Sequence, residues 1–232
     1  QNILRQDLIY RRINARGVPV DARAVAGAQK IMTQEKAQVL ESMKQLTGLA
    51  NPNGRDQLLD WIRAQGSQML NLQKDVVQDE IDYQTAHLGS PFGNPSNDAQ
   101  RKLIIRVLEM RQTLAKTSTS KYDAMARNLC PWDNRMRDLW QFYGASRTGR
   151  VAGRVLNPAD LARPRLDDPD LTVECVAEGN HEMLTTLYPE HSPLETLSWC
   201  IRASLKAPEG PLWCVADLTS IETVGLAPAV QY

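Results

Sequence analysis

The feature that most constrains the fold is a long apolar stripe in the first quarter of the chain. Six apolar residues between Asp21 and Gly48 recur at the spacing of one helical face: Val25, Ala28, Met32, Val39, Met43 and Leu46. Such spacing predicts an amphipathic α-helix. Asp21 is placed to accept hydrogen bonds from the first unpaired N–H groups, and Gly48 to end the helix. We therefore expect one long helix over this segment.

The chain up to about residue 130 is predicted to remain helical. Apolar periodicity and capping residues indicate four further helices, at residues 55–64, 69–84, 98–114 and 117–128. The segments between them are rich in Gly, Pro, Ser and Asn, which are typical of turns and loops. This part is therefore expected to form a region built of helices alone.

The pattern changes after Pro131. The expected elements are a strand at residues 135–143, a strand pair at 144–154, helices at 172–187 and 194–203, and a strand at 212–217 followed by a helix from 220. The predicted fold class is α+β, with a helical region at residues 1–130 and a mixed α/β region at residues 131–232.

Composition narrows the class of protein. The 27 Lys and Arg residues balance 27 Asp and Glu residues, so only a local basic track is available for nucleic acid. No apolar run approaches the ~20 residues of a membrane span, so we expect no membrane partner and a cytoplasmic location. The chain begins with Gln1 and its last residues carry no stop signal, so both ends are interpreted as cuts.

The cysteines and histidines do not indicate a metal site. None of Cys130, Cys175, Cys200 and Cys214 lies in a C-x-x-C pair, and the three histidines are not at zinc-ligand spacing from them. We interpret the cysteines as reduced, buried thiols.

Asp217 is the residue with the clearest chemical potential. It ends an apolar predicted strand and precedes a predicted helix. A carboxylate held at the end of a strand suits Mg²⁺, which binds through one or two carboxylates together with substrate phosphates. An Asp in this position can also serve only to cap the following helix, which is the commoner role. Spacing alone leaves both interpretations open.

Two basic groups are candidates for binding phosphate. Arg147, Arg150 and Arg154 lie among glycines that allow close approach of the backbone to a ligand. Lys116 and Lys121 flank a run of hydroxyl residues, which suits a phosphate backbone. The alternatives are an ordinary solvated turn for the arginines and helix capping for the hydroxyl residues.

Six segments, taken in order, resemble one polymerase family. They are INARGVPVD at 13–21, LTGLANPN with LLDW within 46–61, LAKTSTSKY at 114–122, QFYGASRTGRVAGR at 141–154, IRASLKAPEG at 201–210 and VADLTSIE at 215–222. Together they resemble family A DNA polymerases, the family of bacterial DNA polymerase I, and specifically its phage branch. The resemblance implies the helical thumb and the front part of the palm of a right-hand polymerase, through motif A.

The resemblance also implies roles for individual residues. Asp217 and the backbone carbonyl of Leu218 would hold catalytic Mg²⁺, and Glu222 would be the gate that excludes a nucleotide 2′-hydroxyl. In the TGR unit, Thr148 and Arg150 would contact the primer–template duplex. The remaining basic residues would follow the duplex backbone: Lys116, Lys121, Arg147 and Arg154. The partners implied are primer–template DNA and a deoxynucleoside triphosphate.

Departures from the family pattern leave a second interpretation open. The arginine that usually follows the position of Glu222 is absent, as is a Gln-Asn pair after Arg154, and Leu205 and Leu218 stand where aromatic residues are usual. The fingers helix and the second catalytic aspartate are not in this sequence. We therefore expect this chain alone to be inactive, with a longer chain or a second polypeptide supplying the missing parts. The alternatives are a non-catalytic DNA-binding protein derived from a polymerase, or a partner-binding role without nucleic acid.

Overall fold

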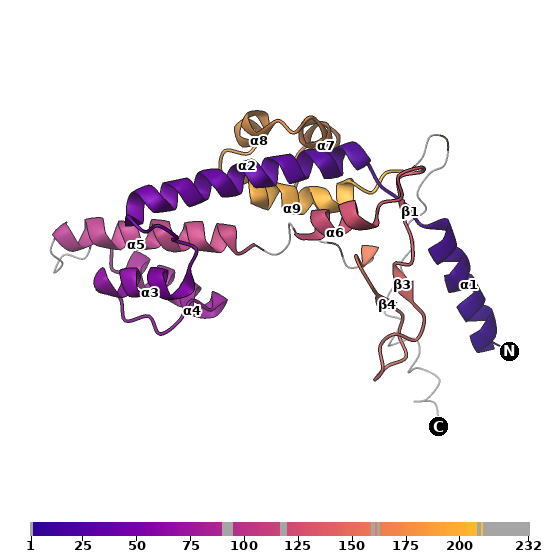
Figure 1. The fold of residues 1–232 in the computed structure, drawn as a ribbon, viewed down its shortest axis with the longest axis horizontal. Helices are drawn as coiled ribbons and strands as arrows, with labels where there is room; N and C mark the ends of the chain where they lie inside the picture. Colours follow the sequence, from indigo (N-terminus) through magenta and orange to yellow (C-terminus); the bar gives the residue numbers. More distant parts are fainter. Residues whose placement is uncertain are drawn as a thin grey trace, which may run out of the picture.

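A computed structural model describes residues 2–89, 95–116, 120–158, 161, 163–207 and 210. The elements, in order, are α1 (Asn2–Arg16), β1 (Val18–Pro19), α2 (Ala22–Thr47), α3 (Arg55–Ala64), α4 (Lys74–Ala86), α5 (Pro95–Leu114), α6 (Ser120–Asn128), β2 (Arg135–Met136), β3 (Trp140–Gln141), β4 (Ala152–Gly153), α7 (Pro169–Glu178), α8 (His181–Leu187) and α9 (Pro193–Ala203). In Figure 1, α2 runs along the long axis, with α3–α5 around one end and α6–α9 along the other half. The paired strands and α1 extend beyond that second half.

The long helix α2 confirms the first sequence prediction, including its two ends. The Asp21 carboxylate accepts hydrogen bonds from the N–H groups of Arg23 and Ala24. Gly48 adopts a left-handed conformation with φ 69°, and its N–H donates to the carbonyl of Lys44. Only a residue without a Cβ enters this conformation at little energetic penalty, which is why the helix ends here.

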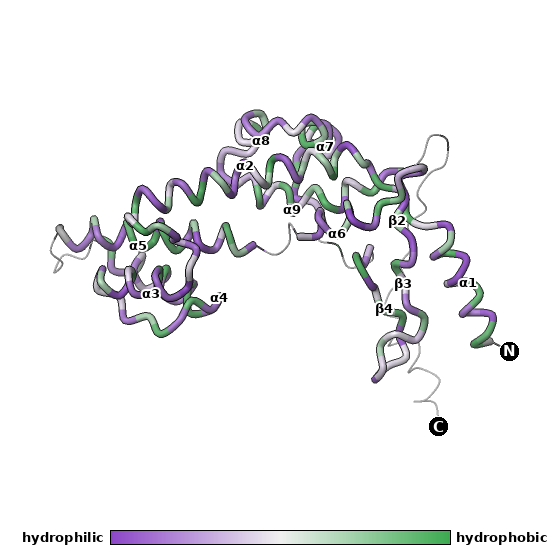
Figure 2. Tube along the Cα trace, viewed as in Figure 1, coloured by the Kyte–Doolittle hydropathy of each residue, from purple (hydrophilic) through white to green (hydrophobic). Residues whose placement is uncertain are grey.

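Helix α2 contributes to two separate hydrophobic cores. Its first half packs with α6, α7, α8 and α9 in a first core that includes Val25, Tyr122, Val176 and Leu197. Its second half packs with α5 and contributes to a second core that also includes residues of α3 and α4. The buried side chains of the second core include Met43, Leu58, Ile62, Val77, Ile81, Ile104, Val107 and Leu108. Figure 2 shows the corresponding alternation of hydrophobic and hydrophilic residues along α2 and α5.

The first core takes residues from both sides of residue 130. Val25 and Tyr122 precede that position, whereas Val176 and Leu197 follow it, and all four are buried in the same cluster. The boundary between the two cores therefore falls along α2 and does not coincide with residue 130. The division into a thumb at residues 1–130 and a palm at residues 131–232, which the resemblance implies, stays a prediction.

Helix α1 was not predicted from the sequence. Its apolar side chains are not packed into either core, and Ile3, Leu4 and Leu8 are 65%, 70% and 57% exposed. Burial of an apolar face usually stabilises a helix, and within the described residues α1 lacks most of that contribution. Its attachment comes from polar contacts near its C-terminal end, described below.

Two predicted helices have different boundaries. The helix expected from residue 69 begins at Lys74, because Met69 is buried in an extended segment whose carbonyl accepts a hydrogen bond from Arg63 Nε at 2.9 Å. The helix expected at 172–187 is two helices. Gly179, with φ 68°, ends α7, and the Asn180 side chain accepts the N–H of Met183 to begin α8.

The strand predictions were only partly right. Residues 135–143 do not form one strand, because Asp138 has a positive φ of 55° and separates β2 from β3. β1 pairs with β2, and β3 pairs with β4, each antiparallel. Within 144–154 only Ala152–Gly153 is a strand, and the rest is turn and loop. The final strand at 212–217 and the helix from 220 lie outside the described residues.

Candidate nucleic-acid interface

The candidate interface is the hairpin formed by β3, β4 and the turn between them. The turn is closed by its own backbone, since the N–H groups of Thr148 and Gly149 both donate to the carbonyl of Ala145. The Ala145 N–H in turn donates to the Arg150 carbonyl at 3.0 Å. Gly149 has φ 66°, and a Cβ there would lie 2.7 Å from the Tyr143 ring. The position therefore requires glycine, because a side chain would be both strained and overlapping.

This closed turn presents the predicted DNA-binding residues on the surface. Arg147, Thr148 and Arg150 are all exposed. Thr148 Oγ1 accepts the N–H of Arg150 at 3.4 Å, which links the two residues within the turn. The structure thus brings these three predicted residues together on one projecting loop, where a charged ligand can reach them.

Arg154 lies after β4 and lines a groove that the sequence did not predict. Its N–H donates to the carbonyl of Leu139 at 2.9 Å, which holds it beside β3. The groove has a volume of about 560 Å³. Its lining residues come from the end of α6, the following turn, β2 and the segment after β4: Asn128, Cys130, Trp132, Arg135, Arg137, Asp138, Arg154 and Val155. The alternation of arginines at 135 and 137 is a sequence signal that could have indicated it.

The C-terminal end of α1 is fastened to this strand region by side chains. Asn14 Nδ2 donates to the carbonyl of Trp140 at 2.7 Å, and the Trp140 N–H donates to Asn14 Oδ1 at 3.0 Å. This pair imitates the hydrogen bonding of a neighbouring strand. The rings of Tyr10 and Phe142 stack with centroids 5.7 Å apart. The last two turns of α1 are therefore in contact with residues 140–142, at the start of the hairpin.

Arg135 and Arg137 reinforce the same junction. Arg135 Nη1 donates to the carbonyls of Arg16 and Gly17, each at 3.3 Å, and Arg137 Nε donates to the carbonyl of Ala15 at 3.0 Å. These carbonyls belong to the last turn of α1 and the residue after it, where a helix lacks internal donors. Arg137 also forms an ion pair with Asp133. Hydrogen bonding from Arg137 lowers the pKa of the Asp133 carboxyl well below its usual range.

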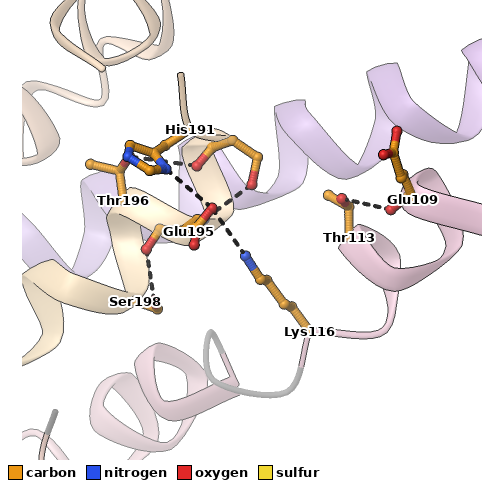
Figure 3. Close-up of polar contacts among 8 residues, drawn as sticks. Glu109, Thr113, Lys116, His191, Glu195, Thr196 and Ser198 are labelled. Atoms are coloured by element: carbon orange, nitrogen blue, oxygen red, sulfur yellow. Dashed lines mark hydrogen bonds and ion pairs between the residues drawn. The ribbon is translucent and has the colours of Figure 1, made fainter. Parts of the chain in front are cut away.

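The two predicted lysines lie elsewhere. Lys116 Nζ is 3.8 Å from Glu195 Oε2 on α9, and His191 Nδ1 is 3.5 Å from the same oxygen (Figure 3). Lys121 is half-buried in the first turn of α6. In Figure 1, α6 lies beside α2 and α9, whereas the hairpin projects away from these helices. The basic residues predicted to bind DNA are therefore distributed over two parts of the molecule.

The predicted catalytic and metal-binding residues are not described. Asp217, Leu218 and Glu222 lie outside the described residues. Among the residues that are described, no group of three or more His, Cys, Asp or Glu side chains is placed to hold a metal ion. Cys175 and Cys200 are buried free thiols, as predicted. Cys130 is also a free thiol but is only half-buried, and Cys214 is not described.

Comparison with known proteins shows sequence similarity to a DNA polymerase. The chain is 38% identical over 210 residues to a DNA polymerase of Bacillus phage SP02. The chain is homologous to part of a phage DNA polymerase. The aligned region covers 90% of this chain but spans only 30% of the length of that polymerase. No family model matches the chain, and no solved structure matches it.

The phage polymerase relationship bears on the sequence predictions at a coarse level. It confirms the expected link to a phage DNA polymerase, and the alignment is long enough to include most of the six segments. No helix in the described part of the chain is long and apolar enough to cross a lipid bilayer. The relationship does not by itself assign the chain to family A, to thumb and palm, or to roles of individual residues.

Proposed function

We propose that this chain is part of a family A DNA polymerase and holds the primer–template duplex. The observation that carries the proposal is the closed turn that exposes Arg147, Thr148 and Arg150, within a segment that resembles the family. The relationship to a phage DNA polymerase supports the same function. In this assignment α2–α6 belong to the thumb, and the hairpin belongs to the front of the palm.

The electrostatics of the hairpin suit sequence-independent binding. Each arginine that neutralises a phosphate releases condensed counterions, so affinity falls as salt rises. Arg150 would reach the duplex near the growing end, while Arg147 and Arg154 would contact the backbone. Lys116 already forms an ion pair with Glu195. It would therefore contribute to DNA binding only if its ammonium group contacted a phosphate and Glu195 at the same time.

The chemistry of nucleotide addition is proposed from the resemblance alone. Asp217 and the Leu218 carbonyl would hold Mg²⁺, which when bound lowers the energy of charge that develops on the reacting oxygens. Glu222 would stand against a 2′-hydroxyl and so select deoxynucleotides. The second catalytic aspartate and the residues that bind the nucleotide triphosphate would come from the polymerase outside this chain, so the chain alone is inactive in this account.

A non-catalytic DNA-binding role is the second candidate. It is favoured by the absence of the arginine after Glu222 and of the Gln-Asn pair after Arg154. Both candidates predict binding of duplex DNA. They differ in polymerisation once the remaining parts of the polymerase are supplied.

Binding to a fluorescent primer–template duplex, followed by anisotropy, tests the shared prediction. Arg150→Ala is expected to weaken binding by roughly 5- to 150-fold, because one well-placed contact is lost. Arg106→Ala on α5 is the matched control, since Arg106 is also exposed but lies on a helix of the second core. Equal affinity of the two variants and the unmodified chain would contradict the proposed role of the hairpin.

A further inference from the structure

Trp132 is the most exposed aromatic residue among those described. It lies in the turn between α6 and β2 and is 87% exposed. The other described tryptophans, Trp61, Trp140 and Trp199, are half-buried or buried. Covering the large apolar surface of an indole ring is favourable, so the exposure of this one suggests a ligand that covers it.

The surroundings of Trp132 form the arginine-lined groove. Arg135, Arg137 and Arg154 line it together with Trp132. Asp138 also lines the groove, and Asp133 is paired with Arg137, so three arginines against two aspartates leave a net positive charge. The volume of about 560 Å³ is within the range of ligand sites in proteins.

Two of these arginines are held in place before any ligand arrives. Arg135 and Arg137 donate to carbonyls at the end of α1. Both hydrogen bonds of Arg135 to these carbonyls come from Nη1, which is one of the three nitrogens that share the five N–H donors of a guanidinium. A side chain that is already ordered loses little conformational entropy on binding. The groove therefore combines one exposed aromatic face with oriented cationic donors.

We propose that this groove binds an unpaired stretch of DNA, with a base stacked on Trp132 and phosphates at Arg135 and Arg154. The combination of an aromatic face and a positive track is what recognition of single strands needs, because every unpaired base offers a free π-face. Duplex bases are already stacked on one another and do not offer that face. The inference rests on the proposed function, because Arg154 directly follows β4 and so continues the hairpin that would hold the duplex.

The test compares three DNA probes on the intact chain. They are an oligothymidylate of about 12 nucleotides, a blunt duplex, and a duplex with an unpaired overhang. Trp132→Ala is expected to weaken oligothymidylate binding by roughly 5- to 150-fold and to leave blunt-duplex binding unchanged. Trp132→Phe keeps an aromatic face, so its affinity for oligothymidylate is expected to lie between those of Trp132→Ala and the unmodified chain. Because the indole is exposed, thermal unfolding should be the same for all three proteins.

The outcomes separate this inference from the proposed function. If Trp132→Ala binds oligothymidylate as well as the unmodified chain while Arg150→Ala weakens duplex binding, the groove is not a single-strand site and the proposed function stands. If Trp132→Ala weakens all probes equally, the preference for an unpaired strand is wrong. If the unmodified chain binds no probe, the inference and the proposed function are both wrong.

Discussion

Helices α2 and α7 cross so closely that a glycine-to-alanine substitution in α2 is expected to destabilise the protein, although alanine has the higher helix propensity. Gly27 is buried in α2, where a Cβ would overlap the carbonyl oxygen of Val176. The same Cβ would lie 2.9 Å from the carbonyl carbon of Val176 and 3.0 Å from the carbonyl oxygen of Ala177. All three are backbone atoms, so relief requires α7 to move as a unit. Gly27→Ala is therefore expected to destabilise the first core.

The magnitude follows from two opposing contributions. Alanine is favoured over glycine inside a helix by about 1 kcal/mol. Overpacking against a rigid neighbour opposes this by roughly 1–3 kcal/mol and occasionally more, and backbone overlap places this site at the upper end. We expect Gly27→Ala to lower the free energy of unfolding by about 2 kcal/mol or more.

Urea unfolding followed by circular dichroism measures this change. Ala26→Gly is a matched control, because Ala26 is the exposed neighbour of Gly27 in the same helix. The control is expected to lose only about 1 kcal/mol, from propensity alone. If Gly27→Ala instead raises stability by about 1 kcal/mol, α2 and α7 do not approach as closely as described.

Two further predictions concern the α1 junction and the buried thiol. Asn14→Ala removes both hydrogen bonds to the Trp140 backbone, so we expect a loss of about 1–3 kcal/mol and faster amide exchange at residues 139–154; unchanged exchange there would contradict the junction. Burial raises the pKa of Cys200 from 9.0 to about 12, so the folded state keeps its proton where the unfolded state loses it. This contribution to the free energy of unfolding is fully present below pH 9, and above pH 9 it is expected to fall by up to about 1.4 kcal/mol per pH unit. Cys200→Ala should flatten this pH dependence between pH 9 and 10 in urea titrations. An unaltered pH dependence would refute the raised pKa of Cys200.

Local signals explain which parts of the fold could be predicted. Asp21 and Gly48 act on the N–H and C=O groups nearest to them, so the sequence contains all that is needed to place the ends of α2. Gly179 acts locally too, but apolar residues on both sides obscured its role. The short strands depend instead on partners far away in the chain, such as Val18 opposite Met136. Periodicity within one segment does not report such pairing.

The candidate site divides in the same way. Arg147 and Arg150 were predicted because the glycines around them signal an exposed turn. The groove was not, because Arg135 is held by carbonyls of Arg16 and Gly17 that are more than a hundred residues away in sequence. The ion pair of Lys116 with Glu195 likewise depends on the packing of α9 and left no mark in the sequence near either residue.

The salt dependence of duplex binding tests the central claim most directly. If Arg147 and Arg154 contact phosphates, with Lys116 and Lys121 adding to them, the slope of log K against log salt is expected between about −1.8 and −3.6. Arg147→Ala should reduce its magnitude by about 0.9, whereas Arg106→Ala should leave it unchanged. A slope near zero, or one that the two substitutions change equally, would contradict a duplex-holding role for this chain.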